Sequence, residues 1–232
     1  MKPAPVEGRP RIVIVIDDMG LDRRRSSRIV ELPGPLTLAW LPYAKQLPVQ
    51  TEAARKAGHE LIVHVPMQPD GPNDPGPNAL MTGLPEAEIR RRLGIGLSAF
   101  HGYVGINNHM GSRFTADAAG MNVVLDELAQ RGLLFLDSRT TGASAVASIG
   151  SHHSLPLAAR DVFLDHEQTP AFLAQALART EAIARQNGVA IAIGHPHDVT
   201  AAALEAWLPT LEKKGFQLVP VSAVAKVQRP AS

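Results

Sequence analysis

Carboxylates and imidazoles follow most of the apolar segments that the sequence predicts as strands. Asp17 and Asp18 come directly after the run RIVIVI. Later segments end in the same way, with His64; Asn107, Asn108 and His109; Asp137 and Ser138; Asp165 and His166; and His195 and His197. The carboxyl ends of parallel strands meet at one edge of a sheet. The sequence therefore predicts a polar site at this edge.

The adjacent pair Asp17 and Asp18 is the most informative part of this pattern. Two neighbouring carboxylates repel each other, and burying even one is costly without a compensating cation. A divalent metal supplies that cation, and imidazole with carboxylate ligands suits zinc, manganese, iron, cobalt or nickel. If the strand continues, its pleat directs Asp17 and Asp18 to opposite sides, so we expect them to have different roles. Asp137 and Asp165 have a structural alternative, as N-caps of the helices that follow.

The elements that must position these residues alternate between strands and helices. Strands are predicted at 11–17, 36–41, 60–65, 103–107, 133–137, 161–165, 189–194 and 216–219, and helices at 23–31, 48–57, 86–99, 116–131, 170–187 and 200–214. Thr169-Pro170 resembles a helix start, and Gly132 and Gly188 resemble helix stops. Such alternation gives an α/β fold, either an open doubly wound sheet or a barrel, and the number of units favours the barrel.

Composition narrows the possible functions. The chain has 232 residues, of which 45% are hydrophobic and 19% charged, and its formal net charge is +1. This balance predicts one domain over residues 11–228 and gives no electrostatic case for binding nucleic acid. Without cysteine, metal ligands must be nitrogen or oxygen. No apolar run is long enough to span a membrane, and residues 1–10 are interpreted as a flexible leader or linker without a signal peptide.

Six segments together resemble the divergent branch of the polysaccharide deacetylase superfamily of carbohydrate esterases. They are VIVIDDMG at 13–20, HELIVHVPMQP at 59–69, GINNHMGSRFT at 105–115, LFLDSRTT at 134–141, RDVFLDH at 160–166 and AIAIGHPH at 190–197. The resemblance implies a distorted (β/α) barrel of about seven parallel strands. It also implies a metal-dependent hydrolase, with zinc as the expected metal, that removes acetyl groups from a carbohydrate.

The resemblance also implies roles for individual residues. Asp17 matches the catalytic base, Asp18 and His64 match metal ligands, and His195 matches the general acid. The family's second metal-binding histidine is replaced by Gln68, and the resemblance offers His109 as the substitute ligand. Residues expected to contact substrate or to support these groups are Asn108, Ser112, Asp137, Arg139, Asp165 and His197.

Two elements of the main family, R-x-P and D-x-x-D-W, are absent, and Asp137 and Arg139 are the candidates to replace them. This loss and Gln68 favour an alternative hypothesis, a catalytically degenerate polysaccharide-binding or scaffold module. A metal phosphoesterase is a third and weaker hypothesis, because only Arg113 and Arg139 are available to bind an anion.

The resemblance suggests a periplasmic or cell-envelope location, with the cytoplasm as the alternative. The aromatic residues expected nearest the site are Trp40, Tyr43, Tyr103 and Phe114.

Overall fold

The computed structural model describes residues 8–227. Most of the predicted leader, residues 1–7, and the last residue of the predicted domain, at 228, lie outside the described residues. Within the leader, the Pro10 carbonyl accepts a hydrogen bond of 2.9 Å from the Gln217 amide. The single domain over residues 11–228 stays a prediction. No helix in the described part of the chain is long and apolar enough to cross a membrane.

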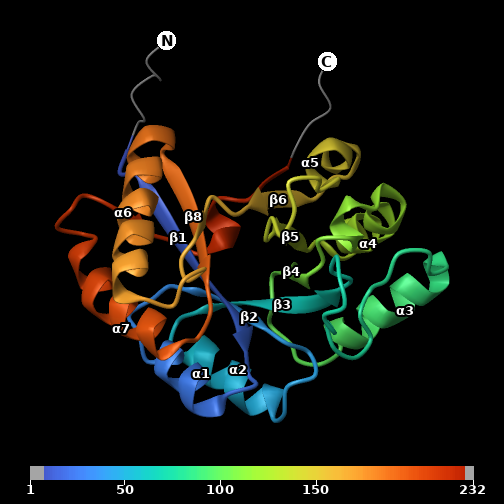
Figure 1. Cartoon of the computed structure of the whole chain (residues 1–232), viewed down its shortest axis with the longest axis horizontal. Coiled ribbons are helices and arrows are strands. Elements are labelled where there is room, and N and C mark those ends of the chain that lie inside the picture. The colour runs from blue at the N-terminus through green and yellow to red at the C-terminus, as the bar shows by residue number, and fades with distance from the viewer. Residues whose placement is uncertain (1–7, 228–232) are drawn as a thin grey trace.

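A strongly curved sheet forms the centre of the molecule (Figure 1). Its strands are β1 (Arg11–Met19), β2 (Thr37–Trp40), β3 (Glu60–Met67), β4 (Gly105–Met110), β5 (Leu134–Asp137), β6 (Pro156–Ala159), β7 (Val162–Phe163), β8 (Val189–Gly194), β9 (Gln217–Leu218) and β10 (Lys226–Val227). The strand order is β10-β6-β5-β4-β3-β2-β1-β8-β7, and β9 pairs beside β1. Only β10 is antiparallel.

Helices cover the outer side of this sheet (Figure 1). They are α1 (Arg23–Val30), α2 (Leu47–Lys56), α3 (Glu86–Leu97), α4 (Ala118–Arg131), α5 (Val146–Ile149), α6 (Pro170–Asn187) and α7 (Asp198–Trp207). The predicted caps are confirmed. The Thr169 hydroxyl accepts from the Phe172 amide at the start of α6, and Gly132 and Gly188 end α4 and α6 in the left-handed conformation.

The predicted α/β class and barrel-like architecture are confirmed, but the predicted number of strands is wrong. The principal path holds nine strands rather than seven. The difference arises partly where one strand was predicted at 161–165. The chain instead forms β6, which pairs with β5, and β7, which pairs with β8. Arg160 and Asp161 lie between them, and their amides donate to Asp137 on one side and Ile191 on the other.

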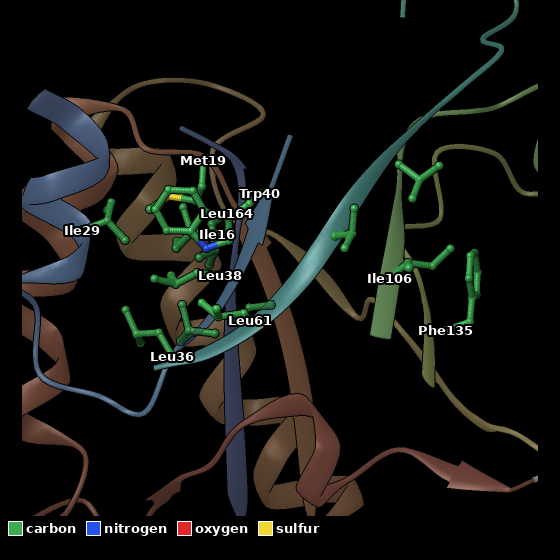
Figure 2. Close-up of a cluster of buried hydrophobic side chains, with 14 of the residues drawn as sticks. Ile16, Met19, Ile29, Leu36, Leu38, Trp40, Leu61, Ile106, Phe135 and Leu164 are labelled. Atoms are coloured by element: carbon green, nitrogen blue, oxygen red, sulfur yellow. The ribbon is translucent and has the colours of Figure 1, made fainter. Parts of the chain in front are cut away.

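The two faces of the sheet bury different sets of side chains. Ile12, Ile14 and Ile16 of β1 face the helices. Figure 2 shows Ile29 of α1 pointing toward this cluster. The alternate residues Val13 and Val15 face the concave side of the sheet. There they pack with small or branched side chains from other strands, including Ala39, Ile62, Leu134, Leu136, Ile191 and Ile193. The period of two along each strand therefore fixes which later residues enter the concave side.

Gly105 allows β4 and β5 to approach closely. A Cβ atom built there would collide with the carbonyl oxygen of Leu134. Gly105→Ala is therefore expected to destabilise the protein by about 1–3 kcal/mol or more, because backbone must move. Gly94→Ala is the matched control, since Gly94 lies in α3 with nothing within 4 Å of the added methyl. The control should gain up to about 1 kcal/mol, measured by urea unfolding. Equal stability of the two variants would contradict this role for Gly105.

Candidate metal centre

The concave face of the sheet continues as polar side chains where the strands end. Asp17 follows Val13 and Val15, His64 follows Ile62, and His195 follows Ile191 and Ile193 with the same spacing of two. On β4 the pairing of Asn107 with His64 places both on this face. The same hydrophobic alternation that builds the inner core therefore delivers these polar groups to one cavity.

Asp18 reaches the cavity by a different route. Its backbone has a φ of 56°, in the left-handed region, and the register of β1 against β2 shifts between Ile16 and Met19. The register shift and the left-handed φ interrupt the regular pleat inside β1 at Asp18. Opposite sides were expected for Asp17 and Asp18 only if the strand continued regularly, and this irregularity breaks that condition. Both carboxylates line the same cavity.

Three possible metal-ligand atoms converge beside this irregularity of β1. The Asp18 Oδ1 atom lies 2.9 Å from His109 Nδ1 and 3.3 Å from His64 Nε2. The two nitrogens lie 3.1 Å from each other. Zinc held at about 2.0–2.1 Å by each ligand would space them about 3.3 Å apart, the edge of a tetrahedron. The Asp18 Oδ1 atom is also buried without a hydrogen-bond partner. This donor set fits a divalent metal.

Asn107 connects this ligand set to the neighbouring carboxylate. Its amide nitrogen donates to Asp17 Oδ1 at 2.7 Å and to the Ser138 hydroxyl at 3.1 Å. Its amide oxygen, which can only accept, lies 2.7 Å from His64 Nδ1. His64 must therefore donate from Nδ1, which leaves the lone pair of Nε2 facing Asp18 and His109. Asn107 is fully buried, so these contacts are shielded from bulk solvent.

The charges of the site act strongly on one another. Burial raises the pKa of Asp17 above its usual value, despite opposing effects of His64, His195 and Asn107. Burial also acts to raise the pKa of Asp18, but the imidazoles of His109 and His64 lower it overall. Burial acts to lower the pKa of His64, but the charges of Asp17 and Asp18 raise it overall. The negative charge that favours a proton on His64 equally favours a metal cation.

His195 lies on the other side of the carboxylates. Its Nε2 atom is 3.9 Å from Asp18 Oδ2, and its Nδ1 atom lies 3.0 Å from Asp165 Oδ1. Burial acts to lower the pKa of His195, but Asp165 raises it to about 9. The other oxygen of Asp165 accepts from the His195 amide and the Thr200 hydroxyl. The charges of Asp17 and Asp18 add to this rise in pKa, and the contact with Asp165 fixes the imidazole with Nε2 directed toward the carboxylates.

The other predicted site residues divide into two groups. Asn108 and Arg139 line the cavity with the five residues above. Asp165 acts through His195, while Ser112, Asp137 and His197 are not among the cavity's lining residues. Ser112 accepts from the Asp70 amide, and Asp137 accepts from the Arg139 amide and Ser144 hydroxyl. These two side chains hold loops. The ring of His197 lies near that of His195 and is tilted against it by 39°, with ring centroids 5.7 Å apart.

Gln68 does not join the ligand set. Its side-chain oxygen accepts from both the amide and the hydroxyl of Thr82, at 2.8 and 2.9 Å. Gln68 thus holds the loop after β3. The aromatic expectation was wrong as well, because Phe163 lines the cavity whereas Trp40, Tyr43, Tyr103 and Phe114 do not.

Sequence reasoning missed three residues of the site. Asn107 was noticed only as part of the strand end, although its spacing of two from His109 placed both on the concave face. Arg160 and Phe163 also line the cavity, which has a volume of about 460 Å³. Both lie in the motif RDVFLDH at 160–166, but no role was assigned to either, because their place in the cavity depends on the unpredicted break between β6 and β7.

Comparison with known proteins identifies a matching family model and two relatives of this chain. The model of the family described as divergent polysaccharide deacetylase matches residues 14–225. An uncharacterized protein of Haemophilus influenzae is 32% identical over 209 residues, which is 90% of this chain and 74% of the relative. The uncharacterized protein YibQ of Escherichia coli is 33% identical over 195 residues, 84% of this chain. The match spans only 61% of YibQ.

Solved structures show the same fold. The crystal structure of an uncharacterized protein from Agrobacterium tumefaciens C58 has a TM-score of 0.91 at 32% identity, over 96% of this chain and 92% of that one. A mutant of BA3943 from Bacillus anthracis, described as a CE4 family pseudoenzyme with restored enzymatic activity, has a TM-score of 0.60. It is 17% identical, over 99% of this chain and 74% of that one, and supports the fold alone.

Replacing Asp18 should strongly weaken metal binding, whereas replacing its neighbour should not. In Asp18→Asn the carboxylate becomes a neutral amide, which is a much weaker metal ligand, so zinc affinity is expected to fall at least about 100-fold. Asp17→Asn keeps all three converging atoms and should retain zinc close to stoichiometrically. Both can be measured by elemental analysis after equilibrium dialysis. Equal zinc content in the two variants would contradict the ligand assignment.

Asn107→Asp should make stability depend on pH. The new carboxylate would be fully buried and would lie beside that of Asp17, and both effects raise its folded-state pKa above the unfolded value, against the opposing effect of His64. Such a group loses stability as pH rises above the unfolded pKa. In metal-free protein, we expect an added loss of about 1–3 kcal/mol between pH 5 and pH 8 relative to wild type. Urea unfolding at both pH values measures it, and a pH-independent difference would contradict the contact.

Proposed function

Because the chain belongs to the divergent polysaccharide deacetylase family, we propose that its cavity removes acyl groups, acetyl above all, from a carbohydrate. The proposal includes a divalent metal, zinc for the donor set present, held by Asp18, His64 and His109. The observation that carries it is the convergence of these three ligand atoms beside two further ionisable groups, Asp17 and His195. Neither of these is needed to hold the metal.

The metal, when bound, would polarise the acyl carbonyl and lower the pKa of water, which is the chemistry that hydrolysis at neutral pH requires. The protein's own part is to hold the ligands in fixed orientations. His64 is fixed by Asn107, whose amide also contacts the Asp17 carboxylate. Burial of these groups keeps their geometry from relaxing when substrate arrives.

Asp17 is the proposed general base. Its Oδ1 atom accepts from Asn107, whereas Oδ2 lies 3.7 Å from His64 Nε2 on the side of the ligand set. Burial raises the pKa of Asp17. A carboxylate with a raised pKa accepts a proton more readily, which suits a base acting near neutral pH.

His195 is the proposed general acid. Because its Nδ1 atom faces Asp165, the proton on Nε2 is the one directed toward the reacting groups. With a pKa raised to about 9, His195 carries that proton near neutral pH. It can therefore protonate the departing sugar nitrogen or oxygen as the acyl bond breaks. Asp165 acts through His195 as a positioning residue.

The second candidate function is a polysaccharide-binding or scaffold module without activity. It is favoured by Gln68, whose side chain holds a loop and leaves the ligand set with three protein atoms. The fold likeness to a protein described as a pseudoenzyme also supports it. On this hypothesis the cavity would still bind metal and glycan, but no acyl group would be released.

Acetate release from chemically acetylated xylan and from chitin oligomers tests the proposal. Zinc-loaded wild type is expected to release acetate, and Asp17→Asn to lose at least about 100-fold in rate while keeping its metal. Asp70→Asn is the matched control, because Asp70 is an exposed carboxylate after β3 that does not line the cavity. Wild type that binds zinc and glycan but releases no acetate would favour the module, and equal rates in Asp17→Asn would refute the base.

A further inference from the structure

Two arginines on one wall of the metal cavity lack an acidic partner. Arg139 and Arg160 both line this cavity, and neither forms an ion pair within residues 8–227. By contrast, Arg90, Arg91 and Arg92 of α3 all pair with carboxylates. Burial lowers the pKa of Arg160, the charge of Arg139 adds to this, and the charges of Asp17 and Asp137, both too distant for an ion pair, act against it. Two neighbouring guanidinium groups at a cavity repel each other unless an anion lies between them.

Arg160 is held in place although it has no anionic partner. Its Nε and Nη2 atoms donate to the carbonyl oxygens of Ser138 and Arg139, at 2.7 and 2.8 Å. The guanidinium also lies over the ring of Phe163, 5.1 Å from the centroid. These contacts leave Nη1 without a partner among the described residues. A free surface arginine would lose side-chain entropy on binding a ligand, whereas Arg160 is already ordered.

Arg139 is positioned by its backbone. Its φ is 49°, a left-handed conformation that costs a non-glycine residue about 1–2 kcal/mol. The Arg139 amide donates to the buried Asp137 carboxylate at 2.7 Å, which stabilises this turn. Left-handed non-glycine residues occur preferentially at ligand sites. The loop after β5 therefore holds an exposed arginine at the mouth of the cavity.

A second cavity lies on the other side of Arg160 and Phe163, which line both. It has a volume of about 370 Å³, within the usual range for small-molecule sites. Its remaining walls include the rings of His166 and Phe172 and the polar side chains of Gln175 and Arg179. The rings form a row, with centroids 5.9 Å apart for Phe163 and His166 and 6.3 Å for His166 and Phe172.

The charge of this second cavity is asymmetric. Its lining holds two arginines, Arg160 and Arg179, but only one carboxylate, Asp161. The Oδ2 atom of Asp161 already accepts a hydrogen bond from the Ile191 amide. Arg179 forms no ion pair in the described part of the chain. Aromatic rings offer the apolar faces on which sugar rings stack, and arginines bind carboxylate or sulfate. The two cavities together thus offer a groove for two sugars with a fixed cation between them.

We propose that the second cavity is a sugar subsite and that its ligand is an acidic glycan, with a carboxylate or sulfate that Arg160 binds. The sugar in this subsite neighbours the acylated one, a relation that rests on the proposed function. The anionic group would lie on the side away from Asp17 and Asp18. Arg139 and Arg179 would add attraction from either side of Arg160.

Calorimetric titration tests the subsite without any hydrolysis. The probes are a galacturonate trimer, its monomer, a sulfated galactan trimer and neutral xylotriose, at constant ionic strength. The host is the full chain carrying Asp18→Asn, so that a carboxylate cannot be held by zinc. We expect the acidic trimer to bind at least tenfold more tightly than xylotriose and than the monomer. The galacturonate and sulfated trimers distinguish the two anions.

Variants on this background locate the binding. Arg160→Gln should weaken the trimer at least tenfold and Arg179→Gln severalfold, while Arg113→Gln, an exposed arginine outside both cavities, should have no effect. Phe172 lines only the second cavity, so Phe172→Ala should remove the higher affinity for the trimer than for the monomer. This variant still tests the subsite if Arg160→Gln does not fold.

Equal affinity for acidic and neutral trimers, or equal losses in Arg160→Gln and Arg113→Gln, would overturn the proposal. Trimer binding in a protein that releases no acetate would leave the subsite standing and refute only the hydrolysis.

Discussion

The structure of the site depends on the electrostatic cost of placing two carboxylates side by side at the end of a buried strand. Asp17 is only 4% exposed and sits directly after five fully buried residues of β1. Burial and mutual repulsion both oppose charge on this pair. Hydrogen-bond donors and imidazoles from β3, β4 and the loop after β8 surround it, and the proposed metal cation would complete the balance of charge.

The fold meets this cost with a small number of fixed contacts. Strand periodicity brings His64 and Asn107 to the concave face, where both are nearly or fully buried. Asn107 is bonded to Asp17, His64 and Ser138 at once. Buried polar networks of this kind are strong when complete and costly when one member is missing. The same contacts that stabilise the carboxylates therefore orient His64, a proposed metal ligand, and Asp17, the proposed base.

Much of this could be predicted from sequence, because it follows from local rules. Short, continuous apolar runs located most of the strands, and cap residues located the end of α4 and both ends of α6. The family match confirms the resemblance seen in the motifs, while the roles of Asp17, Asp18, His64, His109 and His195 remain proposals. Their convergence could be expected, since all follow strands. The hydrogen-bonding role of Asn107 could not, because it depends on pairing between β3 and β4.

Other features depend on backbone geometry that has no simple sequence signal. The left-handed backbone conformation of Asp18 interrupts the pleat of β1, and no glycine occupies this position to signal it in the sequence. The break between β6 and β7 exists because one segment must pair with β5 and then β8, which is a property of the whole sheet. Arg160 enters the site only through this break. Its importance therefore emerges from tertiary structure.

X-ray absorption at the zinc edge, on zinc-loaded wild type, tests the account most directly. We expect one zinc per chain, with two imidazole nitrogens and oxygen for the remaining ligands, at about 2.0–2.1 Å. Loss of one imidazole from the spectrum is expected in His109→Ala. A protein that takes up no zinc, or a spectrum that His109→Ala leaves unchanged, would contradict the proposed centre.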